Sequence, residues 1–399
     1  MNISTQEAEK LLKGRQTFSQ VGFSMLLERM KKLYSQEPTE AMLQRVTDEI
    51  NAFLSKFKAI MTTDYEHISD VLTNEKKCHV LAFEDVCTWI EDGKVLHIAG
   101  TEALLRKLPK GSWIGGSTEY FIAEQGGLIS GGLLCVTEID CEDFSIKTYD
   151  VGEIKNVGND AFVNGFSIVI IPFDSEIHKV YSENAAGYEH IFMRNITGWI
   201  AGCNLDVPKQ TPIAVNGALP EAYPDKAVAL HLKIPEDKNV RVNIINVFSQ
   251  DEASPVIEFT REGFSAVNCL VDGKETVFAD YITQNDIDTK LPLVGDYSGN
   301  GVNISFKSVE DGTVNFYAPV FSGIKYRMAQ RLPDYAAAFQ VNIEKASGDN
   351  AVFSCNCILN FLYGRIEDEK VEKFNGPLTF GEIAYQLVNQ TLVYVTVTD

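Results

Sequence analysis

The sequence pattern changes near residue 75, and this change constrains the fold more than any other feature. From about residue 78 onward, short apolar runs rich in β-branched and aromatic residues alternate with turns, as in FSIVIIPF (166–173) and TLVYVTV (391–397). Helical patterns are fewer and lie at 175–185, 321–332 and 380–390. We therefore predict an α/β fold of the mixed α+β type, with mixed β-sheets covered by helices.

Residues 1–75 have a helical pattern instead. Apolar side chains from Met42 to Phe57 recur at steps of three and four residues, as on one face of an amphipathic helix. The break SQEPTE (35–40) separates them from an earlier helical segment, so we predict a helical hairpin or small bundle. Because a lone hairpin cannot bury both faces, it should pack on the rest of the chain, on a second copy in a homo-oligomer, or on a partner protein.

The chain is strongly acidic, with a formal net charge of −20 and a pI near 4.8. Binding to nucleic acid or to anionic membranes needs a basic surface, so the composition argues against both partners. The N-terminus MNISTQEAEK lacks the basic and apolar regions of a signal peptide, and FSIVIIPF is too short to span a bilayer. We expect a soluble cytoplasmic protein of bacterial or archaeal type.

Cysteine and histidine spacing gives no sign of a disulfide framework or a metal site. The eight cysteines include no CxxC pair, and the six histidines include no HxxxH or HExxH pair. Cys355 and Cys357 lie on one side of a predicted strand, which suits burial as well as it suits chemistry, and the GxSxG motif is absent. We therefore predict no catalytic and no metal-ligating residue.

Two glycine-containing segments are the candidate ligand-binding sites. In the first, Gly115 and Gly116 follow an apolar, strand-like approach, and Ser117 and Thr118 follow the glycines. This segment is either a tight turn whose hydroxyls cap the next element, or a nest of backbone N–H groups and hydroxyls that holds a carboxylate or a similar anion.

The second segment is TFGE (379–382). Thr379 and Glu382 flank Gly381 and have the spacing of a capping box at the start of a predicted helix. In the alternative interpretation, Glu382 faces a pocket and pairs with a ligand ammonium group while the first segment binds the carboxylate. An amino acid would then have one recognition loop for each charged end.

The two segments also share a short repeat. The pattern T-x-x-x-I-A occurs at 118–123 and again at 379–384, each time beside glycines. It is compatible with a duplicated architecture, and we place the two related halves at 76–230 and 231–399, with equivalent loops facing one another across a cleft.

These segments carry a resemblance to a known family. WIGGSTEYFIAEQGGLI (113–129) resembles the N-terminal glycine–serine–threonine loop of FIST-domain proteins, and FNGPLTFGEIAYQLVNQTLVYVTV (374–397) resembles the end of their C-terminal half. FSCNCILNFLYGRIE (353–367) is similar to the run that precedes it. The resemblance implies an intracellular sensory protein for signal transduction that binds an amino-acid-like or other small anionic ligand and signals to a partner protein.

Three other functions stay open at this stage. Some FIST-domain proteins are haem-based gas sensors, and His178 or His190 would then be the haem ligand, although we expect no cofactor. The second alternative is an enzyme that acts on a small acidic or amino-acid-derived substrate in the same cleft. The third is a structural interaction protein without a closed polar pocket.

Overall fold

The computed structural model describes residues 78–123, 126–297, 300–346, 351–364 and 374–398. The helical hairpin predicted over 1–75 lies outside these residues. The chain divides into two compact units, and the elements and sites below belong to the unit formed by Lys77–Leu128 and Leu133–Asp399. Ile129–Gly132 are assigned to the other unit.

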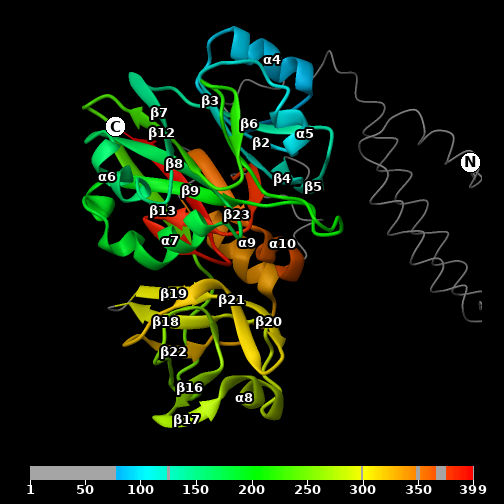
Figure 1. Ribbon diagram of the computed structural model, residues 1–399, viewed down its shortest axis with the longest axis vertical. Helices are drawn as coiled ribbons and strands as arrows, with labels where there is room; N and C mark the ends of the chain where they lie inside the picture. Colours follow the sequence, from blue (N-terminus) through cyan, green and yellow to red (C-terminus); the bar gives the residue numbers. More distant parts are fainter. Residues whose placement is uncertain (1–77, 124–125, 298–299, 347–350, 365–373, 399) are drawn as a thin grey trace, which may run out of the picture. The chain divides into compact units, whose positions relative to one another are not determined.

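Three six-stranded sheets form the larger part of this unit (Figure 1). The first has the order β1-β6-β2-β3-β10-β11, with β1 Cys78–Leu81, β2 Leu96–Gly100, β3 Trp113–Ser117, β6 Leu134–Glu138, β10 Ala214–Asn216 and β11 Glu221–Tyr223. The second has the order β26-β25-β9-β8-β12-β7, with β7 Asp143–Tyr149, β8 Gly165–Pro172, β9 Asn195–Ala201, β12 Ala227–Lys233, β25 Glu382–Ala384 and β26 Gln386–Val388. The third has the order β13-β27-β23-β24-β4-β5, with β4 Tyr120–Ala123, β5 Gly126–Ile129, β13 Asn239–Ile245, β23 Ala351–Cys357, β24 Gly376–Thr379 and β27 Leu392–Thr398.

Two further sheets are built from the region between residues 257 and 328, which Figure 1 draws in yellow and yellow-green. One has the order β17-β16-β14-β22-β18-β19, with β14 Ile257–Glu258, β16 Asn268–Val271, β17 Lys274–Val277, β18 Leu293–Tyr297, β19 Asn300–Ile304 and β22 Lys325–Met328. The other has the order β15-β21-β20, with β15 Gly263–Ala266, β20 Phe306–Glu310 and β21 Thr313–Val320.

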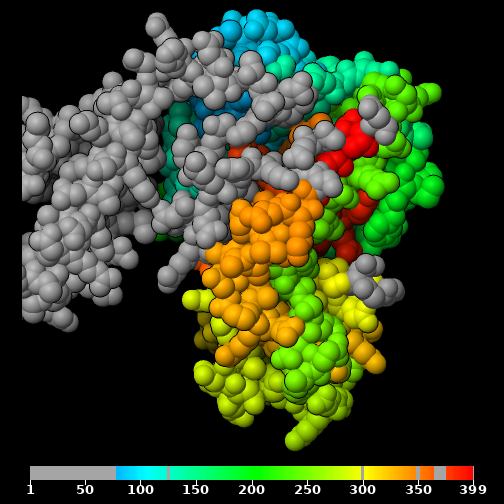
Figure 2. Space-filling model, turned by 180° about the vertical axis from the view of Figure 1, so that it is seen from behind, coloured from blue at the N-terminus to red at the C-terminus, as the bar shows by residue number. Residues whose placement is uncertain are grey.

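A few helices cover these sheets, so the predicted mixed α+β class is confirmed. The α-helices of the described chain are α4 Phe83–Glu91, α5 Glu102–Leu105, α6 Val157–Asp160, α7 Glu176–Asn184, α8 Phe278–Gln284, α9 Tyr335–Lys345 and α10 Ile358–Gly364, and the 3-10 turns are η2 Ile154–Asn156, η3 Ala185–Gly187 and η4 Ile191–Met193. Seen from behind, the orange residues of α9 and α10 form a continuous surface beside the yellow-green residues (Figure 2).

The second sheet lies between two cores, which explains why β8 is apolar along its whole length. Ile168 and Ile170 face a core shared with the first and third sheets, whereas Val169 and Ile171 face a core shared with α7 and the 257–328 sheets. Alternate residues of a strand point to opposite faces, so a strand buried on both faces needs a continuous apolar run.

Two of the three helices predicted in this region are wrong. Residues 321–332 contain β22 and no helix, and residues 380–390 form β25 and β26. In the second case Tyr385 and Gln390 have left-handed backbone angles, with φ of 66° and 48°, which end the strands in tight turns and interrupt any helix. The helix predicted at 175–185 is confirmed as α7, which begins where the Ser175 side chain accepts a hydrogen bond from the backbone N–H of His178.

Strands from both predicted halves build the same sheets. The proposed boundary at residue 230 falls inside β12, β25 and β26 complete the sheet of β8 and β9, and β24 pairs with β4. Segments far apart in the sequence therefore meet in one body, and this brings the two candidate ligand-binding segments together.

Candidate functional site

The carboxyl ends of three parallel strand pairs meet in this unit. The pairs are β2 with β3, β8 with β9, and β23 with β24. Gly202, directly after β9, donates its N–H to the carbonyl of Ser117 at 2.8 Å, and Phe380, directly after β24, donates to the carbonyl of Ile200 at 3.0 Å. Clefts at the carboxyl ends of parallel strands are the usual ligand-binding position in α/β sheets. We call Ser117–Thr118, Gly202 and Leu378–Glu382 the strand-end site.

The first candidate segment lies at this site, but its glycines belong to a strand and not to a loop. Gly115 and Gly116 are inside β3 and pair with β2 and β10. A Cβ atom on Gly116 would lie 2.6 Å from Ile170 and 2.7 Å from Trp199, so only glycine lets the second sheet approach β3 this closely. The predicted bare loop is therefore wrong: packing of the second sheet explains Gly116, and at Gly115 a Cβ atom would lie 3.0 Å from the carbonyl of Ile98 and 3.1 Å from Leu105.

The hydroxyls of the first segment are buried and already bound. Ser117 Oγ accepts a hydrogen bond from the N–H of Ile213 at 2.9 Å. Thr118 Oγ1 donates to the carbonyl of Leu378 at 2.9 Å and accepts from the N–H of Tyr120 at 3.2 Å. The structure thus brings the two candidate segments into contact through the Thr118 hydroxyl, while the Ser117 hydroxyl is bound to Ile213.

Glu382, the charged residue of the second segment, lies on β25 and is completely buried. Glu382 Oε1 is 2.9 Å from Thr379 Oγ1, and Oε2 accepts from the hydroxyl of Thr391 at 2.7 Å and from its N–H at 3.3 Å. No ion pair of Glu382 occurs among the residues that the structure describes. The capping box is therefore wrong, because no helix begins here, although Thr379 and Glu382 do contact each other.

Complete burial favours the neutral form of the Glu382 carboxyl group, and the surrounding hydrogen bonds can accommodate its proton. Thr379 Oγ1 has one proton but two acceptor neighbours, Glu382 Oε1 and the carbonyl of Asn356 at 3.2 Å. If Glu382 Oε1 carries a proton and donates it to Thr379, then Thr379 can donate to the carbonyl of Asn356. Burial raises the pKa of Glu382 to about 8, against the opposing effect of the hydrogen bonds from Thr391 and Thr379.

Amide groups with unused hydrogen-bonding capacity surround this carboxyl group. Asn389 is fully buried, and neither its Oδ1 nor its Nδ2 has a partner within the described parts of the chain. The same holds for Nδ2 of Asn356, one residue before the buried Cys357. We call these residues, with Thr379, Glu382 and Thr391, the Glu382 cluster. All five side chains are buried, so the cluster lies in the interior of the protein.

Partly buried aromatic rings lie beside the strand-end site. The Phe173 ring, directly after β8, is 5.6 Å from that of Phe380, 6.2 Å from that of Tyr317 and 5.4 Å from that of His178. The His178 ring is also 5.4 Å from that of Phe264. These are edge or offset contacts of the kind that stabilise aromatic groups.

His178 and Lys307 add polar groups to these rings. His178 lies in the first turn of α7, is 3% exposed, and its Nε2 has no hydrogen-bond partner among the described residues. Burial and the nearby charge of Lys307 lower the pKa of His178 to about 3, so the ring is neutral. Lys307 Nζ lies 5.1 Å from the centre of the Phe173 ring. We call Phe173, His178, Phe264, Lys307, Tyr317 and Phe380 the aromatic site.

His190, the other histidine named for haem, is in a different setting. It has a left-handed backbone, with φ of 61°, its side chain is 43% exposed, and its Nε2 lies 3.7 Å from Glu189. An exposed ring beside a carboxylate does not form the apolar pocket that haem ligation needs. The ring of His178 is packed against Phe173 and Phe264, which occupy the space beside it.

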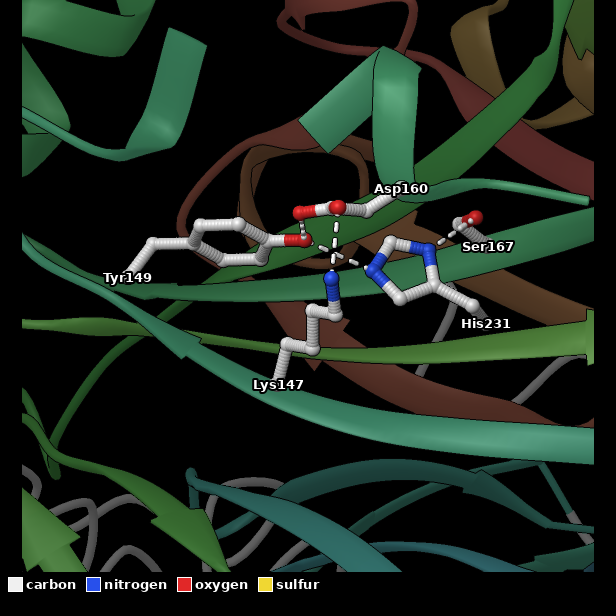
Figure 3. A network of polar contacts seen from close by, with 5 residues as sticks. All are labelled: Lys147, Tyr149, Asp160, Ser167 and His231. Carbon is white, nitrogen blue, oxygen red and sulfur yellow. Dashed lines mark hydrogen bonds and ion pairs between the residues drawn. The ribbon is translucent and has the colours of Figure 1, made fainter. Parts of the chain in front are cut away.

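A second network of polar side chains, partly buried, connects three strands of the second sheet to α6 (Figure 3). Its members are Lys147, Tyr149, Asp160, Ser167 and His231, which we call the His231 network. Lys147 Nζ and Tyr149 OH donate to the two oxygens of Asp160 at 2.5 and 2.8 Å. Tyr149 OH is also 2.8 Å from His231 Nε2, and Ser167 Oγ is 2.7 Å from His231 Nδ1.

These contacts fix the tautomer of His231. Because the Tyr149 proton goes to Asp160, His231 Nε2 must donate to Tyr149, and Nδ1 then accepts from Ser167. Burial lowers the pKa of His231 to about 4, which keeps the ring neutral. Partial burial raises the pKa of Asp160, but the hydrogen bonds from Lys147 and Tyr149 outweigh it and the net shift is downward.

A serine bound to a histidine that is itself oriented by another side chain has the connectivity of an activated nucleophile. Ser167 and His231 are both fully buried at paired positions of β8 and β12, so the structure gives a substrate no access to them. We therefore interpret the His231 network as the connection that holds α6 on the sheet.

Comparison with known proteins identifies a family but no function. Residues 81–398 match the model of a family of unknown function, DUF6976, and the chain belongs to that family. No curated protein and no solved structure matches the chain. The resemblance to FIST-domain proteins is therefore wrong, because the matching family is a different one and no FIST match is found.

The described residues include neither a membrane-spanning helix nor a metal-binding cluster. None of their helices has the length and apolar character needed to cross a membrane. They also contain no group of three or more histidine, cysteine, aspartate or glutamate side chains placed to hold a metal ion.

Sequence reasoning found the strand-end site but missed the aromatic site. Phe173 could have been recognised as a candidate site residue, because it directly follows an apolar strand and stands two residues before the helix cap at Ser175. Phe264, Lys307 and Tyr317 come from another sheet, and their sequence spacing contains no signal for this contact.

Proposed function

We propose that this protein binds a small anionic molecule with a flat apolar part, and that the aromatic site is where it binds. One observation carries this proposal: the Nε2 atom of His178 is buried and has no hydrogen-bond partner among the described residues. This atom lies among aromatic rings, and Lys307 lies next to one of them. A buried polar atom without a partner costs free energy of about 1–3 kcal/mol, and a bound ligand would remove that cost.

The composition of the aromatic site supports this ligand class. Phe173, Phe264, Tyr317 and Phe380 are partly exposed and offer ring surface to an apolar group. Lys307 is exposed and attracts a carboxylate or sulfonate. His178 Nε2 can donate a further hydrogen bond to the same anion if the ring carries its proton there and the rings of Phe173 and Phe264, which pack against it, move apart on binding.

The location also supports binding rather than catalysis. The rings come from both predicted halves, at the carboxyl ends of β8 and β24 and on the 257–328 sheet. The aromatic site contains no nucleophile beside a base, which covalent catalysis would need. Glu382 is engaged with Thr379 and Thr391, so pairing of this residue with a ligand ammonium group is no longer our preferred model. A sensory role and a signalling partner stay predictions.

Calorimetry with simple aromatic anions tests the proposal. We expect 2-naphthoate to bind the full chain, and the uncharged analogue 2-naphthamide to bind at least tenfold more weakly because it lacks the charge that Lys307 attracts. Lys307→Met should weaken naphthoate binding by a similar factor, and His178→Phe should weaken it further while keeping an aromatic ring in place.

The control variant is Lys274→Met, which removes an exposed lysine on β17. It should bind naphthoate like the original protein. Absence of naphthoate binding at millimolar concentration, or equal affinity of the Lys307→Met and Lys274→Met variants, would show that the aromatic site is not the anion-binding site.

A further inference from the structure

Two cysteines at the edge of the first sheet are in direct contact. Cys78 Sγ on β1 lies 3.1 Å from Cys135 Sγ on β6, although 57 positions separate them in the chain. A disulfide bond is about 2.05 Å long, so the sulfurs are within roughly 1 Å of bonding distance. Among the described residues, this is the one pair of thiols in hydrogen-bond contact.

The register of the strands allows the bond to close. Cys78 pairs with Thr137 and Val80 pairs with Cys135, so the two cysteines are diagonal neighbours on one face of the antiparallel pair. Diagonal neighbours lie about 7–8 Å apart at Cα, slightly beyond the usual range of disulfides, so closing the bond requires a small backbone shift. Because β1 is the edge strand and Cys78 is its first residue, this end can shift toward β6 without disturbing a second neighbouring strand.

The two thiols differ in accessibility, and this sets an order of reaction. Cys78 is partly exposed, whereas Cys135 is completely buried beneath it. An oxidant from solvent therefore reaches Cys78 first, and Cys135 is the nearest group that can react with the product. The hydrogen bond with Cys78, together with burial, raises the pKa of Cys135, so the second step should accelerate as the pH rises.

We propose that Cys78 and Cys135 form a reversible disulfide when the protein meets a peroxide. The Cys78 thiolate attacks one peroxide oxygen, the O–O bond breaks, and Cys78 becomes a sulfenic acid while hydroxide leaves and is protonated to water. Cys135 then attacks the sulfur of Cys78, the S–O bond breaks, and a second water leaves. Two thiols and one hydrogen peroxide give one disulfide and two waters, and a dithiol reductant reverses the reaction.

The disulfide would anchor the edge strand β1 covalently to the interior strand β6. A crosslink over 57 positions removes a large part of the freedom of the unfolded chain. Oxidation should therefore raise the melting temperature of the protein by several degrees.

Peptide mapping of the full chain tests this proposal. Reduced protein is treated with hydrogen peroxide, the remaining thiols are blocked with N-ethylmaleimide, and the digest is analysed by mass spectrometry. We expect a peptide pair joined through Cys78 and Cys135, a fall from eight free thiols per chain to six, and recovery of all eight with dithiothreitol.

Two single variants make the outcome specific. Cys78→Ser, at a partly exposed position, should remove both the crosslink and the rise in melting temperature, whereas Cys87→Ser on α4 should change neither. Cys78 found as sulfinic acid without a crosslink, a disulfide between other cysteines, or eight unreacted thiols would each overturn the proposal.

Discussion

In the His231 network the carboxyl group of Asp160 is 25% exposed and contacts Lys147, whereas in the Glu382 cluster the carboxyl group is fully buried and contacts two threonines. The pKa of Asp160 is lowered and that of Glu382 is raised. Asp160 is therefore an ionised group beside a cation, and Glu382 is a neutral acid that both donates and accepts hydrogen bonds.

The comparison shows that hydrogen bonds alone do not determine the charge of a carboxyl group. Both carboxyl groups receive hydrogen bonds, and those bonds favour ionisation in each case. A nearby lysine and partial contact with water favour ionisation of Asp160, whereas complete burial without a cation favours the protonated form of Glu382. Four measurements test this difference between the two carboxyl groups.

The largest effect should be an unusual pH dependence. Glu382 has its usual pKa of 4.5 in the unfolded chain and about 8 in the folded chain, so the folded state holds one more proton between these values. The free energy of unfolding should therefore fall as the pH rises through this window, by about 4 to 5 kcal/mol at most, since one pKa unit corresponds to about 1.4 kcal/mol.

Urea unfolding at pH 5, 6, 7 and 8 measures this effect, with Glu382→Gln as the matched control. Glutamine mimics the neutral acid, because its amide can donate to Thr379 and accept from Thr391, but it does not titrate. The stability of the wild-type protein should fall relative to the variant as the pH rises. Parallel stability curves would contradict a neutral Glu382.

The second effect is the loss of stability in Glu382→Ala at pH 5. This change leaves Thr391 N–H without its acceptor and opens a void in a packed interior, so we expect destabilisation of about 3 kcal/mol. Glu382→Gln should lose less than about 1 kcal/mol under the same conditions, because shape and hydrogen bonds are kept. Equal losses in both variants would mean that the carboxyl proton has no structural role.

The third effect has the opposite pH dependence and belongs to His231. Glutamine cannot reach both Tyr149 and Ser167, so His231→Gln should lose about 2 kcal/mol at pH 7. The pKa of His231 falls from 6.5 in the unfolded chain to about 4 in the folded chain, so its contribution is present above pH 6.5 and is lost as the pH falls toward 4.

Urea unfolding of wild-type protein and His231→Gln between pH 4 and 7 measures this contribution. The difference in stability between the two proteins should shrink steadily with acidification. A difference that does not change with pH would show that His231 is not held as a neutral ring.

The smallest effect concerns Lys147. Its side chain is 45% exposed, and ion pairs at such positions contribute about 0–1 kcal/mol. We expect Lys147→Met to lose less than 1 kcal/mol in dilute buffer and almost nothing in 1 M sodium chloride, where charges are screened. Lys155→Met, at an exposed position nearby, is the control. A loss that persists at high salt would mean that Lys147 acts through packing instead of charge.

The sequence predicted the parts of the fold that depend on local pattern. The apolar run of β8 and the helical pattern at 175–185 were sufficient to place a buried strand and the helix after it. The helix predicted over 380–390 was wrong because Ile383 and Leu387 are spaced like one face of a helix. In the structure they are cross-strand partners in β25 and β26. A spacing of four residues fits both arrangements, and only the turn at Tyr385 separates them.

The meeting of the two glycine-containing segments was predicted, but the chemistry at their contact was not. Contact between Thr118 and Leu378 agrees with the expectation that the two glycine-containing segments converge. The charge state of Glu382 depends on how many protons its neighbours can donate and on complete burial, which are properties of the assembled structure. The aromatic site needs side chains from a separate sheet, so its recognition also required the three-dimensional structure.

The hydrogen bond between Thr118 and Leu378 spans 260 positions, and this separation has a consequence for synthesis on the ribosome. At roughly 5–20 residues per second, Leu378 is made roughly 10 to 50 s after Thr118. During that interval β4 and β9 have no β24 and β25 to pair with, and the nascent chain presents unpaired strand edges to its surroundings. A chain that stops before residue 374 should therefore aggregate instead of folding into a smaller version of the protein, and chaperone binding should be strongest late in translation.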